Sequence, residues 1–118
     1  MADKDVLGRR GEDLAAQFLQ EQGLVVLSRN WRCRLGELDL VATDADKLVV
    51  CEVKTRSGTR FGEPAEAVTE RKAARIRRVT QAWLATHQLG WVEVRFDVLA
   101  VLAEPGRPAT VQHYRSAF

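Results

Sequence analysis

Two acidic residues and a lysine interrupt an otherwise apolar stretch of the chain. Asp39 lies within the run 36–42, and Glu52 and Lys54 lie within the run 48–54. Both runs are rich in Leu and Val, which is typical of β-strands, and the polar residues 44–47 between them predict a turn. The sequence therefore predicts a hairpin that carries charged side chains on strands otherwise suited to a buried sheet.

The register of this hairpin decides which charges meet. If Thr43 pairs with Leu48, the antiparallel ladder places Asp39 opposite Glu52. Directly opposed side chains have Cβ atoms roughly 4.5–5.5 Å apart, and like charges in that position destabilise a sheet. A divalent cation relieves such crowding, because oxygen ligands suit Mg²⁺. We therefore expect Asp39 and Glu52 to bind Mg²⁺ or Mn²⁺.

Lys54 completes the predicted site. Side chains repeat along a strand with period two, so Glu52 and Lys54 share one face. A bound metal would polarise a phosphoryl group and lower the pKa of a water, while Lys54 would orient that water or stabilise charge on the phosphate. The same register places Glu37 opposite Lys54, either as a further metal ligand or as the ion-pair partner of the lysine. The pattern suits phosphodiester hydrolysis.

Positive charge is concentrated just after this hairpin. Residues 54–78 hold eight basic and three acidic side chains, whereas the rest of the chain nets −3. A basic segment that begins at the lysine of an acidic patch favours a polyanionic substrate. The predicted nucleic-acid contacts in this segment are Arg56, Arg60, Lys72, Arg75 and Arg78, and Arg32 joins them from the basic-aromatic cluster ahead of the hairpin.

The remaining pattern supplies the elements that must position these side chains. Apolar residues at helical spacing predict a first helix over 8–22, and residues 24–27 have strand composition. The hairpin spans about 35–54. Thr69 is a predicted N-cap of a second helix that runs to about His87.

Two predicted strands follow the second helix. They span 91–102 and 110–114, and Trp91 falls on the alternating pattern expected of the core. The element order predicts one α/β domain over residues 1–118, with helices packed on a mixed sheet. Both faces of the hairpin are apolar away from the charges, so we expect other elements to cover both.

Bulk composition narrows the class of protein. The chain has 118 residues, of which 46% are hydrophobic and 29% charged, as in ordinary globular domains. No apolar stretch approaches the roughly 20 residues that span a bilayer, and the N-terminus lacks the plan of a secretory signal. We expect a cytoplasmic protein with no membrane partner. Cys33 and Cys51 have no partner motif for zinc, and Cys51 is expected as a small buried side chain.

Several short motifs, in order along most of the chain, resemble a known family. The sequence is similar to the YraN-like bacterial proteins, within the PD-(D/E)xK nuclease superfamily and its archaeal Holliday-junction-resolvase-like branch. The stretches that carry the resemblance are Gly8–Glu12, Asn30–Arg32, Gly36–Val41, Cys51–Arg56, Phe61–Gly62, Ala67–Thr69 and Lys72.

This resemblance implies a three-layer α/β/α restriction-endonuclease-like core with a mixed central sheet. It also implies that Asp39, Glu52 and Lys54 form the catalytic set, with both acids as metal ligands. Glu12 in the first helix is placed at the same site, as a catalytic residue and a third metal ligand. From its position alone, Glu12 would satisfy the helix dipole. Because resolvase-like relatives act as dimers, a homodimer is among the expected partners.

Three functions are compatible with these observations. The first is a Mg²⁺-dependent endonuclease acting on structured or branched DNA. The second is a non-catalytic nucleic-acid-binding module on a nuclease-like scaffold. The third is a protein-interaction subunit whose charged patch is an internal salt-bridge cluster. The pair of opposed carboxylates favours the first, since a binding module has no need of them, and the basic segment argues against the third.

Overall fold

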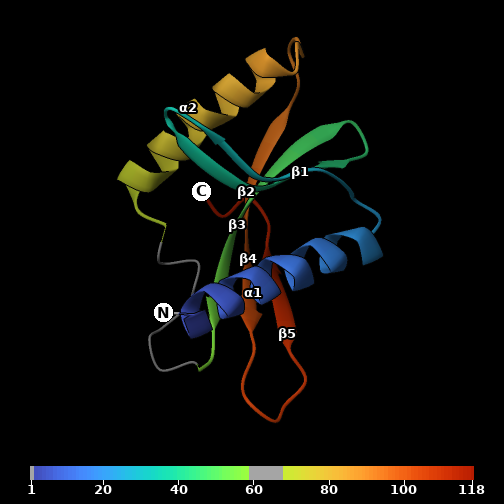
Figure 1. Ribbon diagram of the computed structural model, residues 1–118. Helices are drawn as coiled ribbons and strands as arrows, with labels where there is room; N and C mark the ends of the chain where they lie inside the picture. Colours follow the sequence, from blue (N-terminus) through green and yellow to red (C-terminus); the bar gives the residue numbers. More distant parts are fainter. Residues whose placement is uncertain (1, 59–67) are drawn as a thin grey trace.

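The computed structural model describes residues 2–58 and 68–118, and in this protein two helices pack against a five-stranded mixed sheet (Figure 1). The helices are α1 (Ala2–Glu21) and α2 (Glu70–Thr86). The strands are β1 (Val25–Cys33), β2 (Gly36–Asp44), β3 (Lys47–Arg56), β4 (Val94–Leu102) and β5 (Thr110–Tyr114). The predicted α/β class and mixed sheet are confirmed.

The sheet has the strand order β1-β2-β3-β4-β5, so neighbours in sequence are neighbours in space. Among the strands of the described residues, only β3 and β4 pair in parallel, because α2 carries the chain back between them as a crossover. The other three pairs are antiparallel. Leu48 aligns with Val94 at one end of the parallel pair and Arg56 with Leu102 at the other. These two strands form the middle of the sheet.

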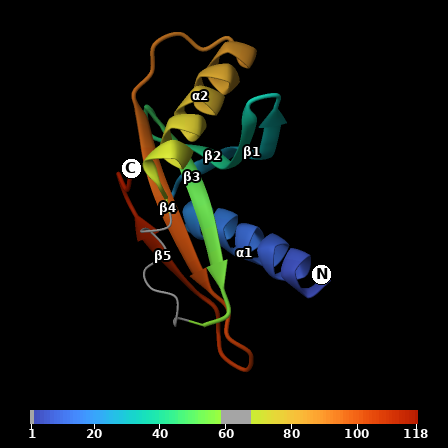
Figure 2. The ribbon, with the colours of Figure 1, turned by 90° about the vertical axis from the view of Figure 1, so that its left-hand side faces the viewer.

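Each face of the sheet is covered by one helix, as the two-sided apolar pattern predicts. On one face, Leu19 of α1 packs with Val49 and Leu99 in one hydrophobic cluster. On the other, Trp83 of α2 packs with Val50 in a second cluster. Figure 1 shows α1 crossing the long strands while α2 lies over the end formed by β1 and β2, and Figure 2 shows the same arrangement from the side.

The second helix follows its sequence pattern closely. Thr69 is the N-cap, and its hydroxyl accepts a hydrogen bond from the backbone N–H of Lys72 at 3.1 Å. His87 is the C-cap. The buried stripe contains the predicted residues, which shows that helical spacing identified the packed face. These residues are Ala73, Ile76, Thr80, Trp83 and Leu84, with Val79 in addition.

Three element boundaries differ from the sequence-based expectation. The first helix begins at Ala2, six residues before Gly8. The first strand extends through the polar residues 28–33, because a register irregularity after Val26 and a left-handed Asn30 (φ 50°) let it keep pairing with β2. The fourth strand starts at Val94, so Trp91 lies before it and is 92% exposed. The prediction of Trp91 as core is wrong.

Candidate active site at the end of the central hairpin

The predicted register of the hairpin is confirmed at its turn end and wrong at its charged end. Thr43 pairs with Leu48, and within residues 36–56 the ladder continues no further than Leu40 opposite Cys51. Asp39 therefore does not face Glu52 as a ladder partner. Its carboxylate oxygen Oδ2 instead accepts the backbone N–H of Val53 at 2.8 Å. A side chain fills the position where a strand carbonyl would continue the sheet.

This hydrogen bond places Asp39 between the two hydrophobic clusters that lie on opposite faces of the sheet. Leu38 belongs to the cluster packed by α2, whereas Leu40 belongs to the cluster packed by α1. The regular alternation of β2 between the two faces of the sheet is thus broken at Asp39, where the strand turns away from β3 and follows β1. The Asp39 carboxylate can interact with acids from both sides of the sheet.

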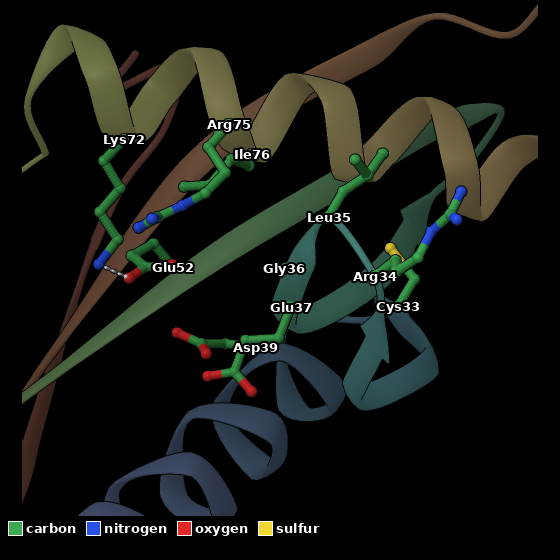
Figure 3. A pocket seen from close by; sticks show the side chains of 10 residues that line it. All are labelled: Cys33, Arg34, Leu35, Gly36, Glu37, Asp39, Glu52, Lys72, Arg75 and Ile76. Atoms are coloured by element: carbon green, nitrogen blue, oxygen red, sulfur yellow. Dashed lines mark ion pairs between the residues drawn. The ribbon is translucent and has the colours of Figure 1, made fainter.

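Two cavities meet at Asp39. The larger has a volume of about 320 Å³, and Glu37, Asp39 and Glu52 line it together with Lys72 and Arg75 of α2 (Figure 3). Figure 3 shows the acids and the two cationic side chains approaching this space from β2, β3 and α2. Gly36 (φ 145°) closes one wall, since an added Cβ would lie 3.2 Å from Val79 Cγ2. The turn between β1 and β2 therefore packs against α2.

The second cavity lies on the α1 side and has a volume of about 310 Å³. Glu12 and Asp39 both line it, so the first-helix acid lies near Asp39, whereas Glu52 lines the other cavity. Gly11 makes the approach of α1 to β3 close enough, because a Cβ there would lie 1.9 Å from Thr55 Oγ1. The sequence Gly-Glu at 11–12 thus serves both the helix crossing and the site.

The electrostatics of Asp39 reflect this convergence. Burial and the negative charge of Glu52 together raise the pKa of the Asp39 carboxyl to about 7, against the opposing effect of the Val53 N–H. Glu12 and Glu37 add smaller contributions in the same direction. Three carboxyl groups therefore act on Asp39, and a strongly perturbed acid in a cleft is a mark of a functional site.

Two lysines neutralise Glu52. The residue is 9% exposed, and its Oε1 forms ion pairs with Lys72 of α2 and with Lys54 Nζ at 3.4 Å. Burial and the adjacent Lys72 amine lower the pKa of Lys54. The Lys72 pKa is raised, because its interactions with Glu52 outweigh the effect of its burial. Both lysines are thus close to the acid pair, and Lys72 lies closer than pattern reasoning indicated.

Glu37 has a different partner from the one predicted. It lies opposite Arg32 in the β1–β2 ladder, and its carboxylate accepts from Arg32 Nε at 2.9 Å. The expected pairing with Lys54 is wrong because β2 leaves β3 before reaching that position. Arg32 remains largely exposed. Glu37 still lines the larger cavity and acts on Asp39.

The other predicted nucleic-acid contacts fall into three groups. Arg75 and Arg78 are exposed on α2, and Arg75 also lines the larger cavity. Arg56 is partly buried, and its Nε has no hydrogen-bond partner among the residues that the structure describes. Arg60, together with the motif residues Phe61 and Gly62, lies outside the described residues.

The described arrangement does not yet form a metal centre. Among residues 2–58 and 68–118, no group of three or more His, Cys, Asp or Glu side chains is placed to hold a metal ion. The carboxylate of Glu52 is turned to its lysines, and one oxygen of Asp39 is bonded to Val53. The donor chemistry nevertheless fits Mg²⁺ or Mn²⁺, since every acid around Asp39 offers hard oxygen ligands.

Sequence reasoning missed a second charged cluster, on β4. Asp97 is fully buried and accepts hydrogen bonds from Arg95 and from the backbone N–H of Ser116, and it lies 2.6 Å from His113 Nε2. Although burial opposes this, the contacts with His113 and Arg95 lower the pKa of Asp97. The cluster fastens β5 and the C-terminal residues to the sheet. A lone acid within the apolar run 94–102 was the available signal.

Comparison with known proteins identifies the family. Residues 11–101 match the uncharacterised protein family UPF0102. The chain is 58% identical to a UPF0102 protein of Frankia casuarinae over the whole of both chains. It is 52% identical to one of Acidothermus cellulolyticus over 98% of this chain and 95% of that protein, and 50% identical to one of Nocardia farcinica over 100% and 93%.

This protein therefore belongs to the UPF0102 family, which confirms the YraN-like assignment made from its motifs. None of the helices in the described ranges is both long enough and apolar enough to cross a membrane.

Proposed function

We propose that this UPF0102 protein is a metal-dependent endonuclease of the PD-(D/E)xK type, which hydrolyses phosphodiester bonds in structured or branched DNA. The proposal extends to the fold, which we assign to the restriction-endonuclease-like α/β/α class. Helices on both faces of a mixed sheet, and the acids at the end of its central hairpin, support that assignment. The proposed setting is the cytoplasm, where free thiols such as those of Cys33 and Cys51 persist.

The observation that carries the proposal is the convergence on Asp39. Burial and three neighbouring acids raise the pKa of this carboxyl to about 7 at the mouth of two cavities. Such crowding of like charges costs folding free energy. Glu52 and Glu37 are paired with bases, whereas the Asp39 carboxylate accepts a hydrogen bond from the backbone N–H of Val53. A cation bound by Asp39, Glu52 and Glu12 would offset the repulsion between their carboxylates.

Each residue has a distinct task in this scheme. When bound, Mg²⁺ or Mn²⁺ supplies Lewis acidity at the phosphoryl group and an acidified water. Asp39 of β2, Glu52 of β3 and Glu12 of α1 would hold the ion. Lys54, beside Glu52, is in position to hold the attacking water or to donate a hydrogen bond to a phosphate oxygen. Its lowered pKa makes proton transfer at Nζ easier.

The surroundings of the acids suit a polyanion. Lys72 and Arg75 line the larger cavity from α2, and Arg78 lies exposed on the same helix. Arg32 is exposed on the neighbouring hairpin. Cationic side chains on both sides of an acidic centre can hold phosphates while a metal contacts the scissile one. A homodimer would offer two such centres to a branched substrate, and native mass spectrometry of the full chain measures that state.

A second function is supported by one specific observation. Two lysines already neutralise the negative charge of Glu52, so this carboxylate needs no metal to compensate it. A non-catalytic nucleic-acid-binding module would retain the basic residues and need no ion. That alternative predicts salt-dependent DNA binding without cleavage.

The test is a cleavage assay with Mn²⁺ over junction, flap, single-stranded and duplex DNA. We expect the wild-type protein to cut at least one structured substrate, and Glu52→Ala and Glu52→Gln to lower the rate by about 100-fold or more, since each removes a metal ligand. Circular dichroism checks that both variants are folded. Equal cleavage by wild type and variants would assign the activity to a contaminant and refute the proposal, whereas metal-independent binding alone would select the binding module.

A further inference from the structure

We propose that Lys72 is the resident counter-ion of Glu52, which a divalent cation must displace in order to bind, and that the displaced ammonium then becomes a phosphate contact. This inference rests on the metal-dependent function proposed above and concerns the regulation of the same site. It assigns to one lysine two successive roles, the first in the metal-free protein and the second in the loaded one.

The backbone of Lys72 is held in the first turn of α2. Its N–H is bonded to the N-cap hydroxyl of Thr69, and Ala73 and Ile76, which follow it in the helix, are buried. The side chain therefore starts from an anchored first turn of α2 and reaches across to β3. Its ion pair with Glu52 joins α2 to the preceding strand β3, as Figure 3 shows.

Lys72 and a metal would compete for the same atom. Both lysines contact Oε1 of Glu52, and the carboxylate is nearly enclosed, with 11% of the side chain exposed. A buried carboxylate needs a compensating charge, and Lys72 supplies it in the described arrangement. A divalent ion bridging Glu52 and Asp39 would bring two further positive charges to that oxygen. The ammonium must then leave, because close like charges repel.

The displaced side chain has somewhere to go. Lys72 lines the larger cavity, which has a volume of about 320 Å³ and is also lined by Arg75. Four rotatable bonds let the ammonium swing from Glu52 into this space without moving the helix. There it would lie beside a second cation, facing the region where substrate phosphates are expected. Metal binding would thereby prepare the phosphate site.

The same arrangement accounts for the absence of a preformed metal centre in the described residues. Glu52 is turned toward its lysines, so it does not join Asp39 and Glu12 in a three-ligand group. Lys54 shares the oxygen at a longer distance of 3.4 Å and comes from the same strand as Glu52. Lys72 is therefore the cation whose removal opens the site.

The experiment is a calorimetric titration of the full-length protein with Mn²⁺, for wild type, Lys72→Met, Lys72→Arg and a control. Methionine keeps the length of the side chain without its charge. The control is Lys47→Met, because Lys47 forms a similar ion pair with Glu93 (Nζ–Oε2 3.2 Å) at the opposite end of β3. Thermal denaturation in EDTA checks folding, and Lys72→Gln replaces Lys72→Met if the latter does not fold.

We expect Lys72→Met to bind Mn²⁺ about tenfold more tightly than wild type, within the usual range of coupling between two binding events. Lys72→Arg and Lys47→Met should stay within about twofold of wild type. Equal or weaker binding by Lys72→Met would overturn this inference and leave the metal site intact. If neither wild type nor any variant binds Mn²⁺, the proposed function fails as well, so the two failures are distinguishable.

Discussion

At the scale of single residues, Asp39 is the most informative side chain. One of its carboxylate oxygens accepts the Val53 N–H, and it lines one cavity with Glu52 and another with Glu12. Its raised pKa, about 7, means that the folded protein binds a proton there that the unfolded chain releases near pH 4. The ionised form of Asp39 therefore opposes folding, and this sets a measurable pH dependence.

We predict that Asp39→Asn stabilises the metal-free fold at alkaline pH. For an acid with a raised folded pKa, the stability contributed by the protonated form is present below the unfolded pKa and is lost as pH rises through about 7. Asparagine does not ionise, so Asp39→Asn keeps its stability as the pH rises. Urea denaturation in EDTA should show it more stable than wild type at pH 8, by a free energy of unfolding on the order of 2 kcal/mol after allowing for partial exposure.

The difference should shrink steadily between pH 7 and pH 4, where wild-type Asp39 becomes protonated in both states. Asp46→Asn, in the exposed β2–β3 turn, serves as the matched control and should follow the wild-type curve. A gap between Asp39→Asn and wild type that is constant over this pH range would show that Asp39 does not titrate as described.

Residue-level predictions from the sequence succeeded where local spacing determines geometry. The Glu-x-Lys spacing placed Glu52 and Lys54 on one face, and they do form an ion pair. The partnership of Glu52 with Lys72 was beyond the pattern, because it depends on how α2 docks on the sheet. The break in β2 at Asp39 was missed for a related reason, since an aspartate that replaces a ladder partner looks like any strand residue.

At the scale of elements, the crossing of α1 over β3 positions Glu12. Gly11 lies against Thr55 so closely that a Cβ would come within 1.9 Å of its hydroxyl oxygen. Glu12 follows directly and lines the cavity shared with Asp39. The contact between Gly11 and Thr55 therefore sets how near the first-helix acid comes to the hairpin.

We expect Gly11→Ala to lower the free energy of unfolding by about 1–3 kcal/mol, because the added methyl group forces α1 away from β3. Gly8→Ala is the matched control in the same helix, since nothing lies within 4 Å of its added Cβ. That variant should be neutral or stabilising by up to about 1 kcal/mol, from helix propensity. Chemical denaturation measures both. Equal effects of the two substitutions would refute a tight crossing.

The helices and strands were predicted best where their hydrophobic residues follow a clear period. The buried stripe of α2 was identified because a full helix averages many apolar positions. The length of β1 was underestimated because Ser28, Arg29 and Asn30 look like a turn, yet pairing with β2 holds them in the strand. Trp91 followed an alternation that the strand itself does not reach. In β1, tertiary pairing overrode local composition.

At the scale of the whole molecule, the sheet brings together groups that the sequence keeps apart. Acids from α1, β2 and β3 surround Asp39, and cations from β3 and α2 face them across one cavity. The layered architecture follows from apolar patterning, and the family from the order of the motifs. The position of the ion within the site could not be predicted, because it depends on which carboxylate oxygens are free.

The most direct test of the account is a crystal structure of the wild-type protein soaked with Mn²⁺, with anomalous diffraction recorded to locate the ion. We predict a peak at coordination distance from carboxylate oxygens of both Asp39 and Glu52, with Lys72 turned away from Glu52 into the larger cavity. Anomalous density elsewhere on the protein, or none at saturating Mn²⁺ while the Glu52–Lys72 ion pair persists, would contradict the account.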